Sequence, residues 1–345
     1  MLDQHHLRRR LLPGVGFIAL AGVLSCRAGG PSYVIEQTVA KPATLSLPPG
    51  VHPEANDTIV HARFQVVRFH VWRGVALDLE QLSARMLSQR DDGVVSLDDK
   101  TSFVLAIDTG AVGLSVGDLG RLMNTYVFAY RGAPLRDLSF EIDGQRLVQR
   151  GILHKGVDIP FEMTGDVSVT AEGEIRVHPI SMKICSINGQ GLMNALGITL
   201  AKLIDVNGAK GVRVVGNDLF LDPVKMLPPP LIRGRLVQVA LKPGRLIQYF
   251  GSADGMATSL RLAPDSAAAN FIQFRGGTMQ FGKMFMVHSD MEVVDMTPSD
   301  PFDFDIDHYR EQLVAGYHRT LPDDGLLVFM PDLNKITAVA TTGSR

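Results

Sequence analysis

Apolar and polar residues alternate along the chain for an unusually long stretch around residue 160. From Val157 to Ala171 the odd-numbered positions are apolar or glycine, and the even-numbered positions are mostly polar or charged. Alternation with a period of two is the pattern of a β-strand with one buried face. At ~3.3 Å per residue such a strand is about 50 Å long, well beyond the usual strand of roughly five or six residues. The pattern therefore predicts a sheet of long strands.

The same period recurs elsewhere in the chain. One parity is apolar at Val67, Phe69, Val71, Val75, Leu77 and Leu79, and again at Phe281, Phe285, Val287, Met291 and Val293. Asp143-Gly144 and Glu172-Gly173 suit tight turns between neighbouring strands. After Glu172 the apolar parity changes at Pro179, as a β-bulge requires. We therefore expect an antiparallel meander of long, strongly curved strands.

Helical periodicity is confined to three short stretches, Val116 to Tyr130, Gln190 to Leu203 and Ile306 to His318. In the first of them, Asp118 is placed to cap or charge the first turn. Apolar stripes of this length usually pack on a sheet rather than form a cofactor site. The balance of strands and helices predicts an α+β fold, in which a long, highly curved antiparallel sheet wraps around one or two short helices.

The N-terminus carries signals for export. A basic start, "HHLRRR", precedes an apolar run from Leu11 to Leu24, which has the length of a signal peptide and is short for a membrane span. The run ends in "VLSC", which resembles the bacterial lipobox and implies that residues 1–25 are removed and that Cys26 is lipidated. A plain secretory signal with an incidental cysteine is the alternative. Arg27, where inner-membrane lipoproteins carry aspartate, resembles the outer-membrane class.

The remaining boundaries follow from composition. Residues 26–58 are rich in proline and glycine, which predicts a lipidated N-terminus and a tether. We expect a single lipid-binding-like α+β domain over residues 59–334 and a flexible tail over 335–345. The protein is then expected on the periplasmic face of the bacterial outer membrane, which it contacts through its N-terminal lipid anchor.

Charge and cysteine content exclude some classes of protein. The 34 basic and 36 acidic side chains nearly balance, so the chain lacks the basic surface that nucleic-acid binding needs. Charged residues make up 20% and apolar residues 46% of the sequence, which is more apolar than a soluble surface requires. Beyond Cys26 the remaining cysteine is Cys185, so we expect no intrachain disulfide and a fold that depends on packing.

Asp108-Thr109-Gly110 matches the short signature that aspartic proteases place at the catalytic carboxylate. Such an enzyme needs two carboxylates that share one proton, so a single-chain member carries the motif twice. No second Asp-Thr-Gly or Asp-Ser-Gly occurs in this sequence. Because aspartate and glycine favour turns, we interpret the motif as a turn between two strands. A protease that uses Asp108 is kept as the least favoured alternative.

Other candidate catalytic or metal-binding patterns fit less well. Asp303, Asp305 and Asp307 have the spacing of calcium ligands, but His308 replaces the turn glycine and Val314 the closing glutamate. We expect an acidic helix start there instead. The histidines lack zinc-binding spacing, and no phosphate loop or catalytic-serine elbow occurs. We expect neither an enzyme nor a bound cofactor or metal.

Apolar surface is the remaining candidate for function. The chain has 14 methionines, which suit adaptable apolar surfaces. Covering a sixteen-carbon acyl chain is worth roughly 12 kcal/mol at about 0.8 kcal/mol per methylene, so a lipid carrier needs a long apolar groove. The candidate groove residues, each equally a candidate for ordinary core packing, are Ile159, Phe161, Met163, Val167, Met193, Leu196 and Leu200.

The order of these elements resembles a known superfamily. The segments "VDIPFEMTGDVSVTAEGEIRVHPISMKI", "GLMNALGITLAKLI" and "GVRVVGNDLFLDPVKMLPPPLIRGRLVQVAL" are similar in layout to bacterial members of the tubular lipid-binding (TULIP) superfamily. The resemblance covers Ile59 to Val294. It implies a curved sheet that wraps a helix and leaves a channel accessible to lipid.

We therefore expect non-enzymatic binding or transport of a lipid or other amphiphile at the cell envelope. The main alternative is an assembly or scaffold lipoprotein that holds envelope protein partners through sheet edges and apolar patches.

Overall fold

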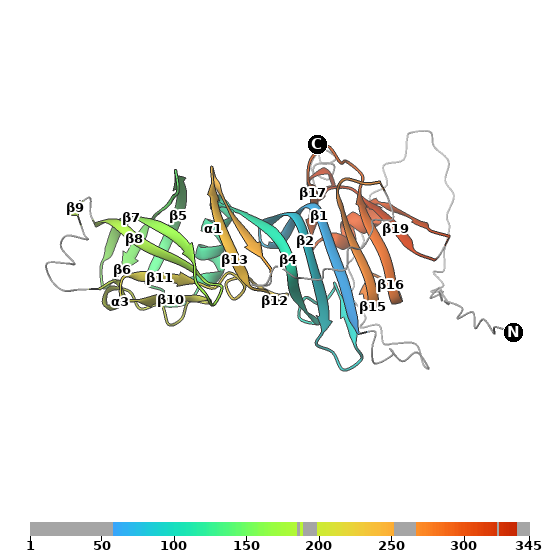
Figure 1. Ribbon diagram of the computed structural model, residues 1–345, viewed down its shortest axis with the longest axis horizontal. Helices are drawn as coiled ribbons and strands as arrows, with labels where there is room; N and C mark the ends of the chain where they lie inside the picture. The colour runs from blue at the N-terminus through green and yellow to red at the C-terminus, as the bar shows by residue number, and fades with distance from the viewer. Residues whose placement is uncertain (1–57, 185–186, 189–198, 252–266, 323, 337–345) are drawn as a thin grey trace, which may run out of the picture. The chain divides into compact units, whose positions relative to one another are not determined.

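The computed structural model describes residues 58–184, 187–188, 199–251, 267–322 and 324–336. All of these residues belong to one compact unit, Pro53–Arg345. They consist mostly of β-strands in two open sheets, with a few short helices (Figure 1). The predicted dominance of strands over short helices is confirmed.

The larger sheet has twelve strands. Its main path runs in the order β13 (Leu236–Lys242), β14 (Arg245–Phe250), β4 (Phe103–Ser115), β2 (Val75–Ser88), β1 (Ile59–Trp72), β15 (Phe271–Phe281), β16 (Met284–Asp295), β19 (Leu326–Met330) and β18 (Tyr317–Thr320). Three short strands pair beside this path: β12 (Leu231–Arg233) with β4, β17 (Phe302–Asp305) with β1, and β3 (Val94–Ser96) with β15.

The smaller sheet has seven strands and comes from a continuous part of the chain between β4 and β12. Its order is β10 (Val212–Val215), β11 (Asp218–Leu221), β8 (Ile175–Ile184), β7 (Asp158–Val169), β6 (Arg146–His154) and β5 (Leu135–Asp143), with β9 (Ile187–Asn188) beside β8. Every strand pair in it is antiparallel, so the predicted meander is confirmed here.

The prediction of one antiparallel sheet is wrong for the molecule as a whole. There are two sheets, and in the larger one four pairs are parallel: β4 with β12, β1 with β17, β15 with β3, and β16 with β19. Parallel neighbours need a long connection between them. The smaller sheet supplies that connection between β4 and β12, which sequence periodicity alone does not reveal.

Local features of the smaller sheet follow the sequence closely. β7 extends over 12 residues, with its even-numbered side chains turned away from the core at Asp166 and Ser168. The turn at Asp143-Gly144 closes β5 onto β6, and Gly144 has a positive φ of 61°. The register of β7 against β8 shifts at Pro179. Ile180 is the extra residue of this bulge and is 36% exposed.

The alternation predicted from Phe281 to Val293 is only partly confirmed. Met291 and Val293 are buried, but Val287, which shares their parity, is 38% exposed. The preceding half of β16 faces the other way because His288 has a positive φ of 53°, which interrupts the pleat. A single residue in the left-handed region is not visible in a pattern of apolar positions.

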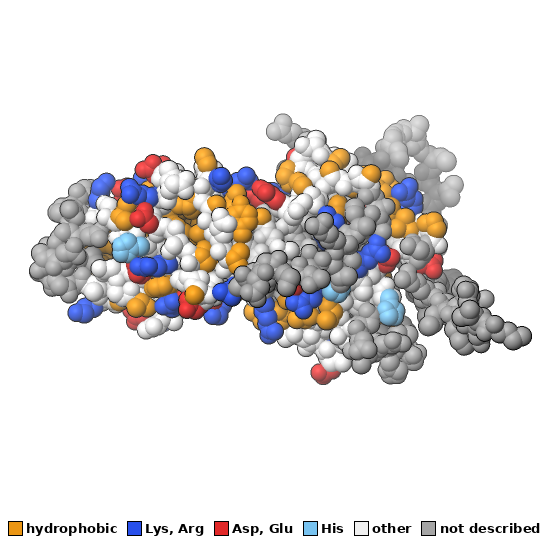
Figure 2. Space-filling view, in the orientation of Figure 1, with side chains coloured by type: hydrophobic (Ala, Val, Ile, Leu, Met, Phe, Trp, Pro, Cys, Tyr) orange, Lys and Arg blue, Asp and Glu red, His pale blue; other side chains and the backbone are white. Residues whose placement is uncertain are grey.

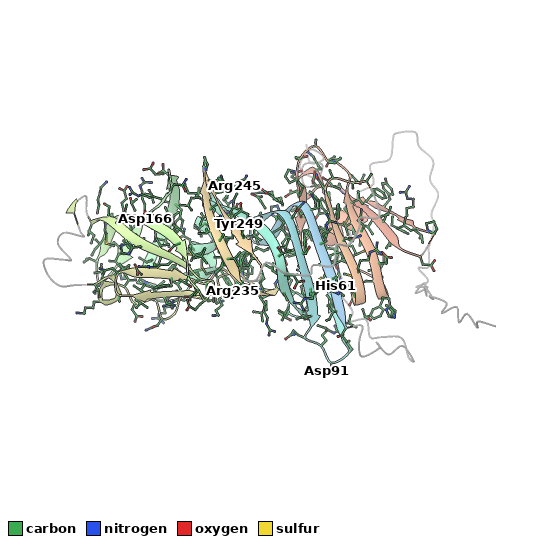
Figure 3. All side chains as sticks on the ribbon, viewed as in Figure 1. His61, Asp91, Asp166, Arg235, Arg245 and Tyr249 are labelled. Atoms are coloured by element: carbon green, nitrogen blue, oxygen red, sulfur yellow. The ribbon has the colours of Figure 1, made fainter. Side chains whose placement is uncertain are left out.

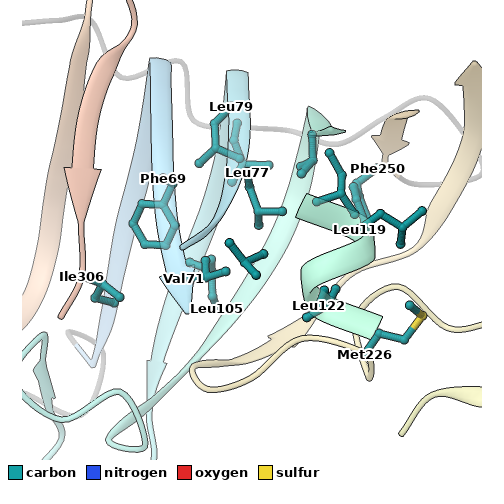
Figure 4. Close-up of a cluster of buried hydrophobic side chains, with 14 of the residues drawn as sticks. Phe69, Val71, Leu77, Leu79, Leu105, Leu119, Leu122, Met226, Phe250 and Ile306 are labelled. Carbon is teal, nitrogen blue, oxygen red and sulfur yellow. The ribbon is translucent and has the colours of Figure 1, made fainter. Parts of the chain in front are cut away.

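The helices are shorter than predicted. The stretch Val116 to Tyr130 forms α1 (Val116–Leu122) and a π-helical turn, η1 (Met123–Val127). Of the stretch Ile306 to His318 only α4 (Tyr309–Ala315) is helical, because residues 306–308 form a turn after β17 and β18 takes up the end of the stretch. Of Gln190 to Leu203, only α3 (Leu200–Leu203) belongs to the described residues. Side chains of α1 pack with those of β1, β2 and β4 in the buried core (Figure 4).

Candidate functional site

The middle strands of the larger sheet turn apolar side chains toward α1. Phe69 and Val71 lie on this face of β1, and Leu77 and Leu79 lie on the same face of β2. All four are buried, as expected from their shared parity in a period-two pattern. Figure 4 shows these residues together with Leu119 of α1. The strands and the helix therefore form two sides of a common apolar region.

Asp118 holds α1 against these strands. Its backbone N–H donates to the Ser115 hydroxyl at 3.0 Å, and its carboxylate accepts from the Ala76 N–H of β2 at 3.4 Å. The Ser115 hydroxyl and the Arg121 guanidinium also donate to this carboxylate. Burial on its own raises the pKa of Asp118, but these hydrogen bonds outweigh it and hold the pKa below its ordinary value. Ser115 is thus the N-cap of the helix, and the ionised carboxylate of Asp118, in the first turn, links the helix to the sheet.

Gly110 of β4 lets Leu82 of β2 come close. A Cβ on Gly110 would lie 2.5 Å from Leu82 Cδ1 and 2.7 Å from the carbonyl oxygen of Gln81. Real side chains do not approach so closely. The absence of a side chain at Gly110 therefore leaves room for Leu82, which faces the apolar region.

These elements enclose the main pocket, a space of about 1030 Å³ that includes solvent at its opening. Its wall comes from both sheets and from the helix between them. The contributing elements are β1, β2, β4, β12, β14, α1, the tips of β6, β8 and β11, and the segment that follows β11. The lining residues are Phe64, Phe69, Val71, Leu77, Leu79, Leu82, Leu105, Ile107, Val112, Leu114, Leu119, Leu122, Leu147, Ile175, Leu221, Pro223, Val224, Met226, Leu227, Pro228, Pro230, Ile232, Leu246, Gln248 and Phe250.

The segment between β11 and β12 forms one wall of the main pocket. Pro223, Pro228 and Pro230 all lie in this wall, next to Met226 and Leu227. Proline has no backbone N–H, so this wall presents fewer polar groups to the pocket than another loop would. The loop therefore continues the apolar lining where regular strand pairing ends.

Comparison of the chain with protein-family models, with curated proteins and with solved structures gives no match. Within the described ranges, no helix has the length and apolar character needed to cross a membrane.

A smaller pocket of about 460 Å³, again counted with open solvent, lies in the seven-stranded sheet. Ile159, Phe161 and Met163 of β7 and Leu200 of α3, all predicted as groove residues, lie together in its wall. Val167, also predicted, packs against the hydrophobic core and lines neither pocket. The wall of the smaller pocket consists of Leu135, Gln149, Leu153, Ile159, Phe161, Met163, Met182, Ile184, Leu200, Leu203, Ile204 and Leu219.

Other residues singled out from the sequence fall outside the described residues. They are the predicted groove residues Met193 and Leu196, the predicted lipid-attachment residue Cys26, and Cys185.

The prediction of a turn at Asp108-Thr109-Gly110 is wrong. β4 continues as one strand from Phe103 to Ser115. β2 pairs with it on both sides of the motif, with a shift of register at Asp108, and β14 pairs with it from Gly110 to Ser115. Asp108 accepts a hydrogen bond at 2.9 Å from Arg85 Nε of β2. Asp108 therefore forms an ion pair between two strands, and Gly110 allows the same two strands to pack closely.

The three aspartates with calcium-like spacing are held apart by separate partners. Asp303 pairs with His70, Asp305 accepts from the N–H of Asp307 at 2.7 Å, and Asp307 pairs with Lys100 at 2.6 Å. Within the described part of the chain, no group of three or more potential ligands is placed to hold a metal ion. Asp303 links β17 to β1, and Asp307 links the turn before α4 to the loop between β3 and β4.

The apolar periodicity of the sequence predicts the strands of the main pocket but not the pocket. Phe69, Val71, Leu77 and Leu79 are predicted to share an apolar face, whereas the groove is predicted on β7 and in the stretch 190–203. The pocket depends on β14 joining β4 and on the return of residues 223–230 after the whole smaller sheet. The proline cluster in "DPVKMLPPPLI", directly after a strand, was the available signal that this loop is ordered and apolar.

Proposed function

We propose that this protein binds a lipid or similar amphiphile in the main pocket without catalysing a reaction. The observation that carries the proposal is the composition of the wall, in which all described lining residues except Gln248 are apolar. Each methylene transferred from water to such a wall gains about 0.8 kcal/mol, so an acyl chain supplies the driving force for binding.

We further propose that binding takes place at the bacterial cell envelope, on a protein exported by its N-terminal signal and anchored by a lipid on Cys26. A likeness to the tubular lipid-binding superfamily remains part of this proposal. It is supported by the long curved strands and by an apolar pocket beside a short helix.

A pocket-filling substitution tests the proposal. Val224 is half-buried and lies in the loop wall. A Val224→Trp side chain would occupy space inside the pocket, whereas Val237→Trp, on β13 at a position that is 43% exposed and outside the wall, would not. We expect the full-length protein and the Val237→Trp control to bind a fluorescent long-chain probe, and Val224→Trp to bind it at least about tenfold more weakly. Equal binding by all three proteins would refute this site.

A second candidate function, the scaffold, is supported by apolar groups on the surface. Tyr317 is 57% exposed on β18, an edge strand whose four residues are all exposed, and Val314 of the adjacent α4 is 80% exposed. Figure 2 also shows apolar side chains gathered on the face that carries β13. Unpaired strand edges and apolar patches are common protein-binding surfaces. Cross-linking in cells that retrieves one defined partner, together with absent lipid binding, would favour this candidate.

A further inference from the structure

Gln248 is the exception in the wall of the main pocket. It lies in β14, the strand that carries Arg245 and Tyr249 (Figure 3), between Leu246 and Phe250, which line the pocket on the same face. It is 5% exposed. Among the described residues no group donates to its Oε1, which is sealed from solvent. A buried amide oxygen without a partner costs about 1–3 kcal/mol, so an uncompensated glutamine is unfavourable here.

Water is a poor partner for this amide. A buried water molecule needs two to four polar partners, and the described lining offers Gln248 alone. A hydroxyl group attached to a hydrocarbon needs only one such partner, because the rest of the molecule is satisfied by apolar contact. A hydroxyl can both donate and accept a hydrogen bond, so it can pair with either the oxygen or the nitrogen of the amide.

The wall also excludes charged head groups. The described residues that line the main pocket include no lysine, arginine or histidine that would neutralise a phosphate or carboxylate inside it. Burying an unpaired anion next to an amide oxygen is strongly unfavourable. A neutral head group with a hydrogen-bond donor avoids this cost.

From these observations we propose that the main pocket selects neutral lipids with a free hydroxyl, such as long-chain alcohols or acylglycerols, and that the Gln248 amide turns its oxygen toward the pocket and recognises the hydroxyl. This specificity rests on the proposed lipid binding. Gln248 acts as the specificity residue, and the apolar wall supplies the affinity.

Four ligands with the same hydrocarbon chain test the specificity. Oleyl alcohol and monooleoylglycerol carry a hydroxyl, methyl oleate carries no donor, and oleate is an anion. Displacement of a fluorescent neutral probe from the full-length protein at neutral pH measures their relative affinities. We expect oleyl alcohol and monooleoylglycerol to bind about tenfold more tightly than methyl oleate, because one hydrogen bond to a buried amide contributes a difference of this size. We expect oleate to bind most weakly.

Gln248→Met keeps the length of the side chain and removes the amide. We expect it to abolish the preference for oleyl alcohol over methyl oleate while methyl oleate binds at least as tightly as before. Gln149→Met is the matched control, because Gln149 is also buried but lines the smaller pocket. It should leave the preference unchanged.

The outcomes separate the two proposals. If all four ligands bind equally, or oleate binds best, the role of Gln248 is wrong and lipid binding stands. If none of the four binds, both proposals fail. Thermal unfolding of the ligand-free protein gives a second test, since removal of an unpaired amide should leave stability unchanged or raise it. A Gln248→Met protein that is less stable than the parent, or that does not fold, would show a structural partner for the amide and overturn the inference.

Discussion

Some residues in this protein have a structural role in strand packing, although their sequence motif is typical of a catalytic site. Gly110 is the clearest example. It belongs to the Asp-Thr-Gly motif, but its lack of a side chain leaves room for Leu82 where β4 pairs with β2. Asp108 contributes an ion pair with Arg85 across the same two strands. Both observations predict effects on stability that differ in size.

Gly110→Ala should destabilise the protein by about 1–3 kcal/mol, because the new Cβ meets the Gln81 carbonyl oxygen as well as a side chain, and overpacking in cores has this cost. Gly117→Ala is the control, since a Cβ there meets only the Ser115 hydroxyl at 3.8 Å and alanine favours helix α1. Chemical unfolding of both variants measures the difference. Equal stability of the two variants would contradict the close approach.

Asp108→Asn should change the free energy of unfolding by less than about 1 kcal/mol, because the ion pair with Arg85 is partly exposed to solvent. It should leave the binding of the long-chain probe unchanged, because Asp108 is outside the wall of the main pocket. Any proteolytic activity that the variant loses would instead support the protease alternative.

Asp118 predicts a dependence of stability on pH. Hydrogen bonds from Ser115, Arg121 and Ala76 hold its pKa in the folded protein below its ordinary value. The ionised group therefore contributes stability above the unfolded pKa, and this contribution is lost as pH falls through the folded pKa. Asp118→Asn should be less stable than the parent at neutral pH, and the gap should narrow below about pH 4. Urea unfolding measured from neutral to acidic pH checks this, and a gap independent of pH would contradict it.

At the scale of elements, short helices and tight turns fix where long strands end. α1 begins directly after β4, and Asp118 in its first turn bonds to β2, so the helix is placed by two strands at once. Because α1 supplies Leu119 and Leu122 to the main pocket, loss of its cap should affect both folding and binding.

Ser115→Ala removes the side-chain cap of α1 and should cost about 1 kcal/mol of stability. It should also weaken binding of the long-chain probe, since the helix forms part of the wall. Thr125→Ala is a suitable control, because the Thr125 hydroxyl donates to the Arg121 carbonyl oxygen at an exposed position. If both substitutions have the same small effect, the cap does not position the wall.

At the scale of the whole molecule, sequence periodicity predicted the strands but not their partners. β7, the turn at Gly144 and the bulge at Pro179 were predictable because they depend on neighbouring residues. The parallel pair β4 with β12 was not, since β12 follows β4 only after the entire smaller sheet. The same separation explains why Gln248 and the loop after β11 were missed, because a pocket built from distant segments leaves no local pattern.

The central claim is that an acyl chain occupies the main pocket, and a photoreactive lipid tests it most directly. A long-chain alcohol with a diazirine in mid-chain would be irradiated with the full-length protein, and the labelled peptides would be identified by mass spectrometry. We expect labels on β1, β2, α1 and residues 223–230, and competition by oleyl alcohol. Labels confined to residues outside this wall, or labels that oleyl alcohol does not displace, would contradict the account.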